Sequence, residues 1–194
     1  ANNRFIDGKA PFGHYSSSIK NLQEFDNILY AGSLTRYFRN KESDFDIEPY
    51  IKTSDKLDKK FNSILKQFND KKRVGISWKS VFNIFGSLKS LELNNFSKLY
   101  NQDSIFINLQ YGDIIEEINN FRASGKNIFS FDNIDLFNDF DSLISILKNL
   151  DVFVTVSNST AHFAGALGVP TILICPKKSS TYYYWDYEDG KTPW

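Results

Sequence analysis

One stretch near the end of the sequence restricts the fold more than any other. Two short runs rich in β-branched and aromatic residues, Val152–Val156 and Thr171–Ile174, are typical of parallel strands buried on both faces of a sheet. Between them, polar residues 157–160 are suited to cap the start of a small-residue helix, and Gly168 and Pro170 are suited to end it. The stretch predicts a strand, a crossover helix and a second parallel strand, with the polar turn at the carboxyl end of the sheet.

The polar turn Ser157-Asn158-Ser159-Thr160 predicts a receptor for phosphate oxygens. Hydroxyl and amide side chains, free backbone N–H groups and the positive end of a helix dipole all favour a bound anion. His162, inside the following helix, is suited to add a donor, although a buried structural histidine explains its position equally well. The alternative for the turn is that its residues only cap a core helix, since Ser and Asn are ordinary N-cap residues.

The rest of the chain from residue 73 onward repeats the same alternation. Strands are expected at 73–77, 105–109, 128–131, 152–156 and 171–174, and helices between them at 91–100, 114–122, 142–150 and after residue 158. Asp141 is the expected N-cap of the third helix. A surface helix is expected to precede the first strand, at Asp55–Phe68. This order predicts an α/β fold with a doubly wound parallel sheet.

Polar residues follow three of the expected strands. They form the loops 77–80, 110–113 and 157–160, which should gather at one edge because parallel strands end on the same side of a sheet. Lys79 would then emerge beside the Ser157 turn, although basic residues at a strand end are more often only solvated. No Gly-x-Gly-x-x-Gly follows the first strand, so no dinucleotide cofactor is expected.

Composition restricts the compartment and the partners. The chain has 194 residues, 41% hydrophobic and 24% charged, as in a soluble globular protein. Its formal net charge is zero, so a nucleic acid is not an expected partner. No apolar run reaches the length of a membrane span, and a single cysteine, Cys175, favours a reducing, cytoplasmic compartment. Only two histidines are present, so no tightly held metal is expected.

The chain begins at Ala1 and contains no methionine, which indicates either a fragment or a sequence in which modified methionines are not printed.

Four motifs together resemble a known family. They are Gly75–Lys79, Leu109–Asp113, Ser157–Gly168 and Trp185–Trp194. In this order they are similar to the C-terminal half of bacterial glycosyltransferases often found behind tetratricopeptide repeats, which are related to the family 9 heptosyltransferases and to O-GlcNAc transferase. The segment Gly32–Arg39 is similar to the end of that family's N-terminal domain.

The resemblance implies a GT-B architecture. Residues 71–194 would be the Rossmann-like domain that binds a nucleotide sugar, and residues 1–70 the remainder of the acceptor-side domain with its linker. It implies that the following residues contact the nucleotide sugar: Ser77, Trp78, Lys79, Gln110, Tyr111, Ser157, Asn158, Ser159, Thr160 and His162. Heptosyltransferases have an acidic residue at the position of Ser157, so their sugar specificity does not transfer. No residue is identified as the catalytic base.

The implied reaction is transfer of a sugar from a nucleotide diphosphate sugar to an acceptor hydroxyl without a metal. The acceptor, whether a glycan, a lipid-linked molecule or a protein, is not specified by the sequence. The alternative is a non-catalytic module that descends from such a transferase and binds nucleotide sugars or a protein partner. A nucleotide-sugar epimerase of the same shape is a further rival, but it would need carboxylates that line the cleft from both domains, which the three loops do not supply.

Overall fold

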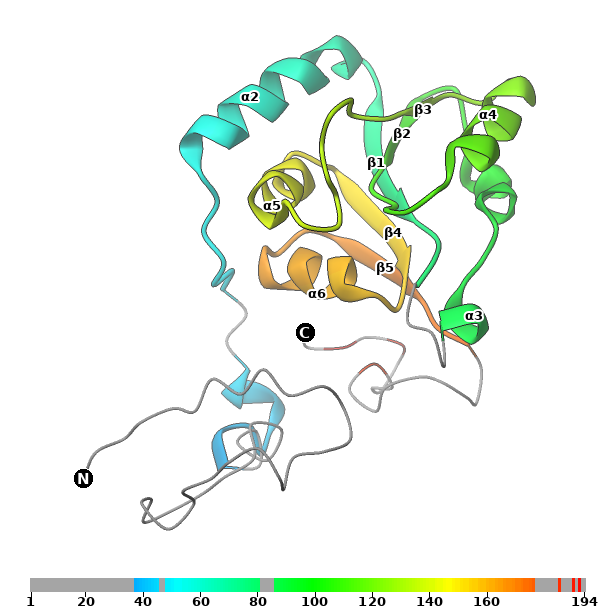
Figure 1. Ribbon diagram of the computed structural model, residues 1–194. Helices are drawn as coiled ribbons and strands as arrows, with labels where there is room; N and C mark the ends of the chain where they lie inside the picture. Colours follow the sequence, from blue (N-terminus) through cyan, green and yellow to red (C-terminus); the bar gives the residue numbers. More distant parts are fainter. Residues whose placement is uncertain are drawn as a thin grey trace, which may run out of the picture. The chain divides into compact units, whose positions relative to one another are not determined.

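The apolar runs expected from the sequence form one five-stranded sheet in the computed structural model (Figure 1). All four strand pairings are parallel, and the strand order is β3-β2-β1-β4-β5. The strands are β1 (Lys72–Ser77), β2 (Ser104–Asn108), β3 (Ile128–Phe129), β4 (Val152–Val156) and β5 (Thr171–Ile174). The chain runs outward from β1 to β3 and then crosses to β4 on the other side of β1. The predicted α/β fold with a doubly wound parallel sheet is therefore confirmed.

The structure describes residues 37–45, 48–80 and 86–176, and the single residues Trp185, Gly190 and Thr192. It divides the chain into two units, Ala1–Phe45 and Asp46–Trp194. The described part of the first unit holds a short turn of 3-10 helix, η2 (Glu42–Asp44), in which the Asp44 carboxylate accepts the backbone N–H of Asn40 at 3.0 Å. Most of the Gly32–Arg39 motif, and of the Trp185–Trp194 motif, lies outside the described residues.

Strand β2 shows why this sequence forms a sheet with two covered faces. Its three central side chains, Ile105, Phe106 and Ile107, are at most 5% exposed. Alternate side chains of a strand point to opposite faces, so Ile105 and Ile107 belong to one hydrophobic cluster and Phe106 to the other. Helices α2 and α5 contribute to the first cluster, and η4 and α4 to the second (Figure 1). Strands without a solvent face explain the nearly continuous apolar runs in the sequence.

The expected helices are present and differ from the prediction in two details, and one further short helix, Gly86–Lys89, was not expected. They are α2 (Asp55–Leu65) with η3 (Lys66–Phe68), α3 (Gly86–Lys89), η4 (Leu93–Leu99), α4 (Ile115–Ala123), α5 (Phe140–Lys148) and α6 (Ser159–Ala166). The expected N-cap of α5, Asp141, is wrong: Asp139 is the cap, and its carboxylate accepts the N–H of Ser142 at 3.0 Å. The segment around 91–100 contains a 3-10 helix in which Leu93 and Phe96 are buried and Leu99 is 51% exposed, and Tyr100 after it packs on Phe106.

Helix α2 precedes the expected domain boundary at residue 70, yet it packs on the sheet of the second unit. Phe61 and Leu65 are fully buried in the cluster that also contains α5. The chain just before α2 is also attached there, since the N–H of Tyr50 donates to Ala166 O at 3.1 Å. The assignment of residues 1–70 to an acceptor-side domain and linker stays a prediction. In the described part of the chain, no helix combines the length and the apolar character needed to cross a bilayer.

Glycine is required at one point in the sheet. A Cβ atom built on Gly75, in the middle of β1, would overlap the side chain of Leu150 and lie 3.0 Å from Phe153 Cδ2. The close approach lets α5 and β4 pack directly against β1, which keeps the tips of β1 and β4 next to each other.

Candidate functional site at the carboxyl edge of the sheet

The strand order creates a switch point between β1 and β4, where the connections leave the sheet in opposite directions. Loops diverge at such a point, and ligands of open α/β sheets bind in the crevice outside the carboxyl ends of the strands. The loops after β1, β2 and β4 are the three that the sequence analysis singled out.

The tips of these three strands are joined by two amide side chains. The Gln110 side-chain oxygen accepts hydrogen bonds from Ser77 Oγ at 3.0 Å, from the Trp78 N–H at 2.8 Å and from the Lys79 N–H at 2.7 Å. The Asn158 side-chain NH₂ donates to Ser77 Oγ at 2.9 Å. Segments that are more than thirty residues apart in the chain therefore converge at one edge, as the sequence analysis expected.

Ser77, Gln110 and Asn158 form the interior of this edge. Their exposed fractions are 0%, 2% and 8%, and their polar groups bind one another. Gln110 also donates its side-chain NH₂ to Tyr111 O at 2.9 Å. Buried polar groups that are satisfied in this way fix a backbone conformation. These three side chains hold the loops in place, and their neighbours supply the exposed surface of this edge.

Helix α6 presents its N-terminus to the same edge. Asn158 is its N-cap, and its side-chain oxygen accepts the Ala161 N–H at 3.2 Å. Ser159 is exposed, whereas Ser157 is 2% exposed and its hydroxyl accepts the indole N–H of Trp185 at 3.1 Å. The Thr160 hydroxyl is buried and has no hydrogen-bond partner among the described residues. The positive end of the helix dipole and this unpaired hydroxyl are both features that favour an anionic ligand.

Lys79 forms an ion pair that the sequence analysis missed. Its ammonium group binds one carboxylate oxygen of Glu117 on α4, and the other oxygen accepts the indole N–H of Trp78 at 2.9 Å. Burial alone would raise the pKa of Glu117, but the hydrogen bonds from Lys79 and Trp78 and the charge of Lys79 lower it below its ordinary value. The Lys79 side chain keeps 37% of its surface exposed, while the Trp78 ring is fully buried in the core. Of these two neighbours, only Lys79 is accessible to a ligand.

His162 and Lys89 lie on the α6 side of the edge. The exposed His162 ring packs on the Trp185 ring, with 4.6 Å between centroids. Partial desolvation lowers the pKa of His162, and the charge of Lys89 lowers it further. Lys89 is 6% exposed and ends α3, which is held beside the β1 tip because the Ser90 hydroxyl bonds both Gly86 and Ser80. The sequence predicts no strand or helix between residues 80 and 91, so Lys89 was not expected at the site.

A cleft of about 770 Å³ adjoins Gln110 at the ends of β2 and β3. Residues 130–137 form one wall and helix α4 forms the other. Tyr111 and the half-exposed Phe137 meet edge to face in this cleft, with 5.4 Å between ring centroids. Tyr111 was expected at the site, but Phe137 was not, because the sequence of 130–137 shows no periodicity that would place it.

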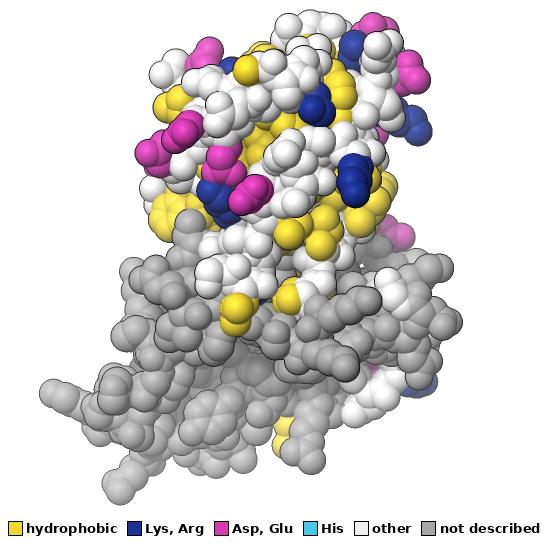
Figure 2. All heavy atoms as spheres, turned by 90° about the vertical axis from the view of Figure 1, so that its right-hand side faces the viewer, with side chains coloured by type: hydrophobic (Ala, Val, Ile, Leu, Met, Phe, Trp, Pro, Cys, Tyr) yellow, Lys and Arg dark blue, Asp and Glu magenta, His cyan; other side chains and the backbone are white. Residues whose placement is uncertain are grey.

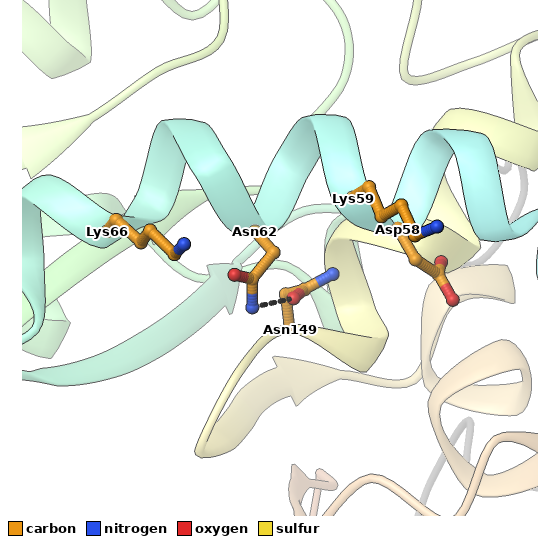
Figure 3. Close-up of a pocket in the computed structure, with 5 residues that line it drawn as sticks. All are labelled: Asp58, Lys59, Asn62, Lys66 and Asn149. Atoms are coloured by element: carbon orange, nitrogen blue, oxygen red, sulfur yellow. Dashed lines mark hydrogen bonds between the residues drawn. The ribbon is translucent and has the colours of Figure 1, made fainter.

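A second hollow, of about 380 Å³, lies on helix α2 and contains none of the expected site residues (Figure 3). Asn62 and Asn149 join its walls through a hydrogen bond of 3.0 Å. Among the described residues, no three side chains of the types His, Cys, Asp and Glu come together as a possible metal site. Figure 2 shows acidic and basic side chains interspersed on the face that carries α4.

Comparison with known proteins gives two partial likenesses. No family model matches the chain. The protein FlbA of Caulobacter vibrioides is 32% identical over 126 residues, which cover 58% of this chain and 20% of FlbA. This chain therefore spans about a fifth of the length of that relative. Among solved structures, the ADP-heptose LPS heptosyltransferase II of E. coli superimposes with a TM-score of 0.47 and 14% identity, over 70% of this chain and 43% of that one.

Proposed function

We propose that the chain is part of a GT-B glycosyltransferase that moves a sugar from a nucleotide diphosphate sugar to an acceptor hydroxyl. In this proposal residues 71–194 bind the donor, and residues 1–70 are the remainder of the acceptor-side domain and its linker. The observation that carries the proposal is the convergence of the β1, β2 and β4 tips through Gln110 and Asn158, beside two lysines and the N-terminus of α6.

The diphosphate would bind at the edge of the sheet, beside the tips of β1 and β4. Lys79 is accessible there, and Lys89 and His162 lie close to each other on the α6 side. The N-terminus of α6 and the Thr160 hydroxyl add donors that an anion can accept. In this proposal Lys79, Lys89 and the helix dipole supply positive charge to the donor's diphosphate, and Thr160 and His162 supply hydrogen bonds, in place of a metal ion.

Such an arrangement is suited to catalysis as well as to binding. The leaving nucleoside diphosphate gains negative charge as the glycosidic bond breaks. Donors that are already fixed around it stabilise the transition state more than the ground state, because they bind best where the charge is largest. The rigid framework of Ser77, Gln110 and Asn158 holds the backbone around Lys79 in advance.

The nucleoside would occupy the cleft beside Tyr111. Its volume of about 770 Å³ lies in the range of small-molecule sites. The aromatic pair Tyr111 and Phe137 offers a surface on which a base can stack, and Gln110 links this cleft to the β1 tip. The base, the sugar, the acceptor and the catalytic base are left unassigned.

A second candidate function is a non-catalytic module that binds nucleotide sugars or a protein. The observation in its favour is that several polar groups of the edge already have partners within the chain: Lys79 binds Glu117, and Ser77, Gln110 and Asn158 bind one another. A transferase that lost its activity would preserve such a framework for stability alone.

Isothermal titration calorimetry of the full chain tests the proposal, with UDP, GDP, ADP and CMP and the corresponding sugar nucleotides as ligands. We expect at least one diphosphate series to bind with a Kd of about 1 mM or tighter and the monophosphate CMP series to bind more weakly. Absence of binding to every diphosphate would contradict the proposal. Incubation of the protein with a labelled form of the sugar nucleotide that binds then separates the two candidates. A transferase transfers the labelled sugar to an acceptor or to water, and a pure binding module does not.

A further inference from the structure

We propose that Glu117 is a positioning residue of the donor site, which holds Lys79 while no donor is bound and competes with the diphosphate for it. The inference rests on the proposed function, because it takes Lys79 to be a contact of the diphosphate. It concerns a residue outside the three strand-tip loops, on a helix that contributes to the opposite wall of the neighbouring cleft.

The two oxygens of the Glu117 carboxylate have partners of different mobility. One oxygen accepts the indole N–H of Trp78 at 2.9 Å, and the Trp78 ring is fully buried beneath α4 and η4. The other oxygen binds the ammonium group of Lys79, whose side chain is 37% exposed. Because Trp78 fixes the carboxylate, any rearrangement at the edge must come from Lys79.

Lys79 is able to exchange partners without a change in the fold. Its backbone is fixed by the bond from its N–H to Gln110 at 2.7 Å, while its ammonium group lies at the end of four flexible methylene groups. A lysine ammonium has three donors in no fixed plane, so it can turn from the carboxylate toward a phosphate bound at the edge.

The charge of Glu117 opposes a bound diphosphate. Without a ligand, the carboxylate neutralises Lys79, which leaves no net charge in the pair. When a diphosphate binds Lys79, the carboxylate remains a few ångströms away and repels it. The pair therefore lowers the affinity for the nucleoside diphosphate and promotes its release after the sugar has been transferred.

Glu117→Gln is the variant that tests the inference, and Glu116→Gln is its matched control. Gln keeps an oxygen that can accept the Trp78 N–H, so the fold should persist. Glu116 is the adjacent acidic residue in the same first turn of α4, but it is exposed. We expect Glu117→Gln to tighten nucleoside diphosphate binding about threefold to tenfold at low salt, mainly through a slower dissociation rate, and Glu116→Gln to change it less than about twofold.

A double-mutant cycle with Lys79→Ala shows whether the effect passes through Lys79. If it does, the change in log Kd caused by Glu117→Gln should be less than about half as large in the Lys79→Ala background as in the wild type. In wild type, ligand binding should also shift the NMR signal of the Trp78 indole N–H, since its acceptor loses the Lys79 partner. The same ligand should leave that signal nearly unchanged in Lys79→Ala.

The outcomes separate this inference from the proposed function. If the wild type binds no nucleoside diphosphate, both fail. If the wild type binds one and Lys79→Ala weakens binding, but Glu117→Gln leaves affinity unchanged or reduces it, the role of Glu117 is wrong and the proposed function stands. An equal gain in Glu116→Gln would also overturn the inference, because it would show a general effect of charge on α4.

Discussion

Two lysine–carboxylate clusters of similar composition lie in different parts of the sheet unit. In the helix pair, Lys148 on α5 binds Asp58 on α2 at 2.8 Å, and Thr53 donates to the same carboxylate oxygen at 2.6 Å. In the edge pair, Lys79 binds Glu117, which also accepts the Trp78 N–H. In both, hydrogen bonds from the partners outweigh burial, which by itself would raise the carboxyl pKa, and the pKa of Asp58 and of Glu117 is lowered.

The surroundings of the two pairs differ more than their chemistry. The helix pair joins two helices on one face of the sheet, next to the hollow of Figure 3, and no strand tip lies in that hollow. The edge pair lies at the carboxyl ends of the strands, where three loops meet. Neither a perturbed carboxyl group nor a nearby hollow distinguishes a functional site here, because both features accompany both pairs. The proposed site differs from the helix pair in its position at the carboxyl ends of the strands.

The largest expected difference between the pairs is in ligand binding. Lys79→Ala should weaken nucleoside diphosphate binding at least about tenfold, about 1.4 kcal/mol, because it removes an accessible cation at the carboxyl edge of the sheet. Lys148→Ala should leave the affinity unchanged, since the helix pair is not at the edge. Calorimetry with the same ligand on both variants makes the comparison, and circular dichroism verifies that both are folded. Equal losses in the two variants would show that the lysines act through net charge and not through a site.

For the free energy of unfolding we expect the opposite order of the two variants, and smaller changes than for ligand binding. Lys148→Ala should lower the free energy of unfolding by about 1 kcal/mol, because Asp58, whose side chain is only 17% exposed, loses its cation. Lys79→Ala should cost less than about 0.5 kcal/mol, since Glu117 is more exposed and keeps Trp78 as a partner. Urea denaturation followed by circular dichroism measures both values. Lys56→Ala, an exposed lysine on the same helix α2, is the control for the loss of a surface charge.

The strands and the convergence of their loops could be predicted from the sequence, because buried parallel strands have a local signature. The runs at 73–77, 105–109 and 152–156 are apolar on both faces, so their positions were predicted within a residue or two. Once strands alternate with helices, the convergence of the three loops follows from the geometry of a parallel sheet. Ser77, Gln110 and Asn158 could therefore be expected together before their hydrogen bonds were known.

The partners of charged groups could not be predicted in the same way. Glu116 and Glu117 are adjacent, and only the rotation of α4 against the sheet decides which of them meets Lys79. Asp139 and Asp141 pose the same problem at the start of α5, where a shift of two residues exchanges the cap. The sequence also gave no reason to separate Trp78, which is buried, from Lys79, which is not. Such choices depend on contacts between elements, which no local pattern encodes.

The smallest expected effect is a difference in acid sensitivity between the pairs. A lowered carboxyl pKa means that the unfolded chain binds protons more readily than the folded one, so stability is lost as pH falls below the ordinary values of 4.5 for Glu117 and 3.8 for Asp58. Lys79→Ala should reduce the loss of stability that begins below pH 4.5, which comes from Glu117. Lys148→Ala should reduce the loss that begins below pH 3.8, which comes from Asp58. Urea denaturation at about pH 6, 4 and 3 measures the slopes of the wild type and of the two variants. Parallel slopes in all three proteins would mean that neither ion pair contributes to folding, and the two pairs would then differ only in ligand binding.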